Sequence, residues 1–109
     1  MKIGLFTATY LDETLEDVFK KAAHYGYEAV ELPAFSDGNT HLDIDGILQN
    51  KSAGDIKKLA AKYNLTISAL SNHTESLLVL GPYGADTEWI HPGTKEERIK
   101  FGTERMIKC

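Results

Sequence analysis

The chain has 109 residues, of which 42% are hydrophobic and 26% charged, and its formal net charge at pH 7 is −4. This composition is typical of a globular protein with one modest core. Lysine and arginine are spread among acidic residues, so no basic patch favours binding to nucleic acid. The apolar run Ile3 to Phe6 is too short for a signal peptide or a membrane span. A single cysteine, Cys109, excludes an intrachain disulfide, and we expect a cytoplasmic protein without a membrane partner.

The first predicted unit is a strand over Lys2 to Phe6, followed by a helix. Thr14 and Asp17 have the spacing of a helix-capping box. One apolar face follows at helical spacing, formed by Leu15, Val18, Phe19 and Ala22. Gly26 predicts the end of this helix, because glycine readily adopts the left-handed conformation there.

The second predicted unit begins with a strand over Ala29 to Leu32 and continues into a long polar loop, Ala34 to Asn50. A loop of this length in a small domain is usually functional or disordered. Ser52 with Asp55 predicts another capped helix, which Asn64 can end. The apolar face of that helix comprises Ile56, Leu59, Ala60 and Tyr63.

The third predicted unit has a strand over Leu65 to Leu70, a second long loop up to Gly93, and a helix opened by Thr94 and Glu97. No stop signal precedes Cys109. The first two units resemble each other within one residue of register, which favours parallel strands joined by right-handed helical crossovers. The alternative is that helix, glycine and strand follow one another in this way in any α/β protein.

Residues that can carry chemistry stand where the predicted strands end, which is where parallel α/β folds bind ligands. Glu31 alternates with two apolar neighbours, so its carboxylate lies either in a barrel interior or at a solvated edge. His73 follows Asn72 at the end of the third strand and can bind a metal, move a proton or contact a sugar hydroxyl. A solvated or helix-capping histidine is the alternative.

Two further positions lie in the predicted loops. His41 and Asp43 are close enough in sequence to form a ligand pair, although a solvated loop is the simpler interpretation. Trp89 either covers a ligand, since aromatic faces stack on sugar rings, or seals the edge of the fold. The sequence has no P-loop, no dinucleotide-binding glycine motif after a strand and no nucleophile elbow, so nothing indicates nucleotide binding or serine-type hydrolysis.

Three segments resemble the xylose isomerase-like TIM barrels, and in particular the sugar phosphate isomerases/epimerases related to endonuclease IV. They are Met1 to Phe6, Gly26 to Leu32 and Ile67 to His73, and the resemblance extends over essentially the whole chain. It implies a (β/α)8 barrel, of which this chain supplies about three βα units as an N-terminal portion spanning residues 1–109. By the same resemblance, His73, Asn72, Glu31 and His41 are substrate-binding positions.

The resemblance also implies an activity. Such enzymes move a proton between carbons next to a carbonyl, with two glutamates as acid and base and a divalent Mn²⁺, Mg²⁺, Co²⁺ or Zn²⁺ ion polarising the substrate. Those glutamates and the metal ligands belong to later strands, so we expect this chain alone to be inactive and to hold no metal. The expected partner is a small sugar or polyol.

Two alternatives remain open at this point. One is a metal-dependent phosphodiesterase of the endonuclease IV type, which the acidic charge disfavours. The other is a non-catalytic α/β fragment that forms homo-oligomers through open sheet edges. Self-association without turnover would favour the non-catalytic fragment.

Overall fold

A parallel sheet of three strands forms the centre of the protein. The computed structural model describes residues 1–109. The strands are β1 (Gly4–Phe6), β2 (Ala29–Pro33) and β3 (Thr66–Ser71), in the spatial order β1-β2-β3 with both pairs parallel. The predicted mixed α/β fold with parallel strands is confirmed, although the first strand begins two residues later than its apolar pattern indicated.

The register of the sheet places Glu31 on the face opposite to the core. Leu5 pairs with Val30 and Phe6 with Glu31. Val30 and Leu32 are fully buried, whereas Glu31 between them is only partly buried. Successive side chains of a strand point to opposite faces, so the carboxylate of Glu31 lies away from these two neighbours. A β-bulge interrupts the pairing of β2 with β3 just before Glu31.

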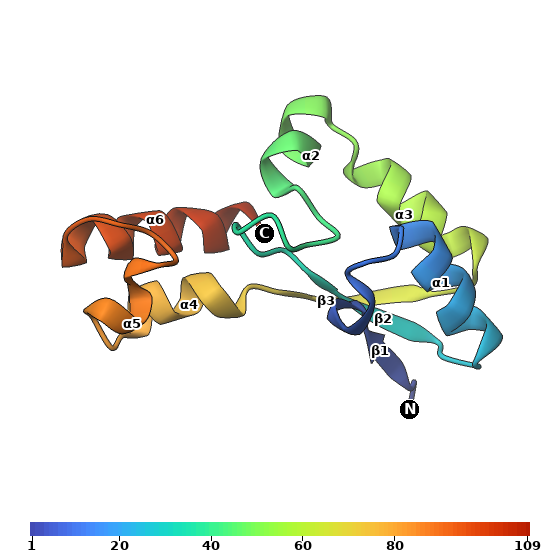
Figure 1. The fold of residues 1–109 in the computed structure, drawn as a ribbon. Helices are drawn as coiled ribbons and strands as arrows, with labels where there is room; N and C mark the ends of the chain where they lie inside the picture. Colours follow the sequence, from blue (N-terminus) through green and yellow to red (C-terminus); the bar gives the residue numbers. More distant parts are fainter.

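Two helices cover the same face of the sheet. They are α1 (Leu15–His24) and α3 (Ala53–Lys62). Both contribute to the core that contains Val30 and Leu32: α1 through Phe19 and Ala22, and α3 through Ala60. Figure 1 shows α1 and α3 near each other beside the sheet. Both connections between parallel strands cross the same face of the sheet, and the strands stand in sequential order. The two crossovers therefore have the same handedness.

The predicted helix ends are confirmed at four of five positions. The hydroxyl of Thr14 accepts the N–H of Asp17 at 3.2 Å, and Thr94 with Glu97 forms a complete capping box. Gly26 and Asn64 have φ of +82° and +58°, as helix-ending residues do. At the fifth position α3 begins directly after Ser52 as predicted, but the predicted cap is absent, because the ψ of Ser52 is 4° and its side chain makes no capping bond.

Both segments predicted to be loops contain helices. The first includes α2 (Ile44–Asn50), capped by the Asp43 side chain, which accepts the N–H of Gly46 at 3.1 Å. The second includes α4 (His73–Leu80) and α5 (Ala85–Glu88), and a short 3-10 helix, Thr7–Tyr10, follows β1. The spacing of apolar residues does not predict α4, because Leu77 to Leu80 are all apolar and no polar positions separate them.

The last helix, α6 (Lys95–Lys108), packs mainly against α4. The α4–α6 pair extends away from the sheet, and the C-terminal end of α6 lies near the loop after β2 (Figure 1). The molecule is therefore elongated, with extents of 45 × 27 × 27 Å. None of its helices combines the length and the apolar character needed to cross a membrane.

Candidate functional site

The carboxyl ends of all three strands meet at a small aromatic cluster. Phe6 ends β1, Phe35 follows β2, and His73 follows β3. The His73 ring lies 6.0 Å from that of Phe6 in an edge-to-face arrangement and 6.2 Å from that of Phe35, centroid to centroid. His73 is nevertheless exposed, and its ring nitrogens have no hydrogen-bond partner in the protein. The structure thus brings this predicted residue to the expected edge of the sheet with its imidazole accessible.

Glu31 and Asn72 lie close to this cluster. Glu31 is the register partner of Phe6, in the last pair that joins β2 to β1. Asn72 directly precedes His73, and its side-chain amide donates to the Sγ of Cys109 at 3.6 Å. The carbonyl oxygen of the same side chain is buried without a hydrogen-bond partner.

His41 has a different environment from His73. Its Nε2 lies 3.2 Å from the carbonyl oxygen of Tyr10, and its Nδ1 lies 3.0 Å from the hydroxyl of Thr7. A carbonyl only accepts, so Nε2 carries a proton and donates, and in the neutral ring Nδ1 accepts from Thr7. Because both ring nitrogens are engaged, His41 holds the turn after β1 in place. The predicted pairing of His41 with Asp43 does not form, since Asp43 caps α2.

A polar cavity of about 480 Å³ adjoins the aromatic cluster through Phe35. It lies between the loop after β2, the first turn of α2 and the last turns of α6. This volume is within the usual range for a small-molecule site. Its lining contains two aromatic rings, three carboxylates, two cations, two hydroxyls and one glycine, namely Phe35, Phe101, Asp43, Asp45, Glu104, Arg105, Lys108, Ser36, Thr40 and Gly38.

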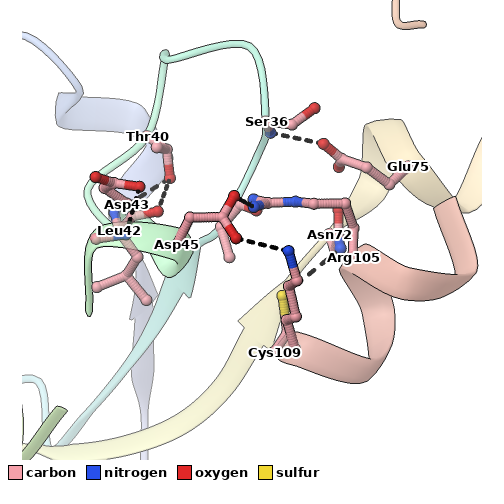
Figure 2. A network of polar contacts seen from close by, with 12 residues as sticks. Ser36, Thr40, Leu42, Asp43, Asp45, Asn72, Glu75, Arg105 and Cys109 are labelled. Carbon is pink, nitrogen blue, oxygen red and sulfur yellow. Dashed lines mark hydrogen bonds and ion pairs between the residues drawn. The ribbon is translucent and has the colours of Figure 1, made fainter. Parts of the chain in front are cut away.

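An ion-pair network on one wall of the cavity joins α6 to the rest of the molecule. The Arg105 guanidinium donates to Asp45 at 3.0 Å and to the carbonyl of Ala34 at 3.1 Å. Lys108 donates to the other oxygen of Asp45 at 2.7 Å. Figure 2 shows the side chain of Asp45 facing that of Arg105. The hydrogen bond from Lys108 is the main reason why the pKa of Asp45 lies below its usual value.

A second buried carboxylate, Glu75, joins α4 to the loop after β2. It is fully buried and accepts from the backbone N–H of Ser36 and from the hydroxyl of Thr74, both at 2.6 Å. Burial raises the pKa of Glu75, but the hydrogen bonds from Ser36 and Thr74 outweigh it, so the pKa is lowered overall. Glu75 therefore remains ionised at neutral pH and fixes the start of α4 beside Ser36.

Sequence patterns alone did not single out Asp45, Glu75 or Arg105. Asp45 and Arg105 are 60 positions apart, so no local motif contains both. The one sequence signal is Arg105 itself, which lies about one helical turn after Gly102 on α6. A cation at the boundary of an apolar stripe often pairs with a distant carboxylate when it is buried.

A second, apolar cavity of about 510 Å³ lies beside β3. It is formed by α2, α3, β3, Leu32 of β2 and the last two residues of the chain, and 12 of its 14 lining residues are hydrophobic. Leu48 and Leu70 on its border are exposed. This cavity offers almost no hydrogen-bonding groups, so it is unsuited to a sugar.

The side chains form no group of three or more His, Cys, Asp or Glu residues arranged to hold a metal ion. The family resemblance assigns the ligands of the divalent metal to later strands, so this finding does not bear on that metal. A comparison with protein-family models finds no match, and neither does a comparison with curated proteins.

Proposed function

We propose that this chain forms three βα units of a (β/α)8 barrel that binds a sugar or related polyol for isomerase or epimerase chemistry. The observation that carries the proposal is the arrangement of the carboxyl edge. Parallel strands in sequential order, covered on one face by α1 and α3, bring Phe6, Phe35 and His73 together beside a polar cavity. Barrel enzymes bind substrate at this edge.

In this proposal His73 and Glu31 contact the substrate directly. The imidazole of His73 is exposed and without a hydrogen-bond partner in the protein, so it is available to a sugar hydroxyl. Glu31 presents its carboxylate on the sheet face opposite to the core, which is the interior face of a barrel. Asn72 adds an amide at the same edge, and His41 positions the turn after β1.

The proton-transfer step itself belongs to groups on further strands. The chain does not bring three metal ligands together, so we assign no step to a metal held by these residues. A phosphodiesterase of the endonuclease IV type remains a weaker proposal, because the net charge of −4 opposes binding to a phosphate backbone.

Self-association is the second candidate, and a specific observation favours it. The strand β3 forms an edge of the sheet and lies next to the apolar cavity with its exposed Leu48 and Leu70. Unpaired edges of this kind pair readily with another chain.

A titration of the ¹⁵N-labelled 109-residue chain with D-fructose, D-xylose and myo-inositol, with and without Mn²⁺, tests the proposal. We expect amide shifts at Phe6, Phe35, Glu31 and His73, without isomerisation of either sugar. Shifts confined to α1 and α3 would contradict the site. Turnover by this chain would contradict the assignment of proton transfer to further strands. A chain that sediments as a dimer and shows no amide shifts with any of the three ligands would favour self-association.

A further inference from the structure

The polar cavity at the carboxyl edge carries a charge pattern that selects among sugars. Its lining holds three carboxylates, Asp43, Asp45 and Glu104, against two cations, Arg105 and Lys108. Both cations already donate to Asp45. Neither cation is therefore free for an anionic ligand. The carboxylates of Asp43 and Glu104 remain without an ion pair to Arg105 or Lys108.

A phosphate group entering this cavity would meet like charge. The Asp43 carboxylate is engaged only by the backbone N–H of Gly46, and Glu104 lies 3.9 Å from Lys100, an exposed pair that water largely screens. Phosphate could reach Arg105 only by displacing Asp45, because the guanidinium is 6% exposed and is also held by Ala34. Displacement would leave one more unpaired carboxylate beside the ligand.

A neutral hydroxyl meets the opposite situation. The three carboxylates accept hydrogen bonds, and the rings of Phe35 and Phe101 provide apolar surface against which a sugar ring can pack. A hydroxyl donates a hydrogen bond to such a carboxylate without bringing a charge of its own into the cavity.

We propose that this cavity binds neutral sugars or polyols and rejects their phosphate esters, with Asp45 and Glu104 as the residues that determine this specificity. The inference rests on the proposed function and narrows its substrate class. It predicts that the ligand of this protein is not phosphorylated.

The test compares D-fructose with D-fructose 6-phosphate by NMR titration at pH 7 and constant ionic strength. For the unaltered chain we expect the ester to bind at least about tenfold more weakly, as one unscreened like charge near the site requires. We expect D45N to free Arg105 and Lys108 and to improve ester binding about tenfold relative to fructose binding, so that the ratio of the two affinities narrows.

Two further variants keep the test decisive. E104Q removes a carboxylate from the cavity without touching the Arg105–Asp45 pair, so it should also improve ester binding if D45N fails to fold. D55N is the matched control, because Asp55 pairs with Lys58 at 3.3 Å on α3 and does not line the cavity. D55N should leave the preference for fructose over its phosphate ester unchanged. Thermal unfolding shows whether each variant is folded.

The outcomes separate this inference from the proposed function. Ester binding as tight as that of fructose, or tighter, overturns the inference while the sugar-binding proposal stands. An equal effect of D55N and D45N also overturns it, because the preference would then reflect net charge alone. Failure of both ligands to bind overturns the inference and the proposed ligand class together.

Discussion

His41 and His73 lie at the same edge of the sheet, yet their contacts assign them different roles. His41 uses both ring nitrogens to hold Thr7 and Tyr10. The ring of His73 lies beside those of Phe6 and Phe35, and its nitrogens make no hydrogen bond within the protein. The difference is decided by which groups the folded chain brings near each ring, since both residues follow polar neighbours in the sequence.

Substitution of each histidine by alanine separates the two roles. We expect His41→Ala to lower the free energy of unfolding by about 1–3 kcal/mol, because the fully buried Thr7 hydroxyl loses its partner. His73→Ala should change it by less than about 0.5 kcal/mol and still weaken D-fructose binding. Urea unfolding and NMR titration measure the two quantities. Equal destabilisation by both variants would identify His73 as a structural residue.

Among the elements, the α4–α6 pair depends on a close approach of the two helices. Gly102 of α6 faces the backbone of α4, and a Cβ at this position would lie 2.7 Å from the carbonyl oxygen of Glu75 and 3.1 Å from the Cβ of Leu78. Only glycine permits this approach. The pairing also places Arg105 one turn further along, where it reaches Asp45.

Gly102→Ala should therefore separate the two helices. We expect a loss of about 1–3 kcal/mol in the free energy of unfolding, since the contact is with rigid backbone. The matched control is Gly54→Ala in α3, where a Cβ meets nothing within 4 Å and should stabilise the helix by about 0.5–1 kcal/mol. Urea unfolding measures both. Two stabilised variants would show that α6 shifts on α4 without cost.

At the scale of the whole molecule, the network around Asp45 connects the α4–α6 pair to the sheet. Arg105 and Lys108 reach Asp45 in α2, and Arg105 also reaches Ala34 directly after β2. Glu75 makes a second connection through Ser36. Without these contacts the pair would be joined to the sheet mainly through the chain itself.

The connection should depend on pH. The pKa of Asp45 is lowered in the folded state, so its contribution to stability is complete above the unfolded value of about 3.8 and is lost as the pH falls through the lower folded value. We expect the chain to be more stable than its Asp45→Asn variant at pH 6, with the difference beginning to shrink as the pH falls below about 4. Glu75 is present in both proteins and cancels in this comparison.

Urea unfolding of both proteins from pH 6 to pH 3 measures that difference. A stability gap that persists unchanged at pH 3 would show that the ionised form of Asp45 is not what joins α6 to α2. Added salt at pH 6 should narrow the gap, because the side chain of Asp45 is 52% exposed and its ion pairs are screened.

Local sequence patterns were enough to predict the three strands and their parallel arrangement, the helices α1, α3 and α6, and the edge of the sheet where Glu31, Asn72 and His73 lie. These features depend on local periods and on caps such as Thr14 and Thr94, which act within a few residues. Two local patterns were misleading. Ser52 makes no side-chain cap, and the left-handed Lys51 directly before it ends α2. The sequence of α4 lacks a clear amphipathic period. In α2 the residues Ile44, Ile47 and Leu48 do have helical spacing, inside a segment expected to be a loop.

Three features became visible only in the folded chain: α6 packs on α4, both ring nitrogens of His41 are bonded, and Arg105, Asp45 and Lys108 line one cavity. Each of these depends on contacts between residues more than 20 positions apart, such as Arg105 with Asp45 over 60 positions and His41 with Thr7 over 34. Local propensity carries no information about which distant groups meet, because that depends on how the helices pack. The cavity and its charge pattern therefore had to be observed in the folded chain.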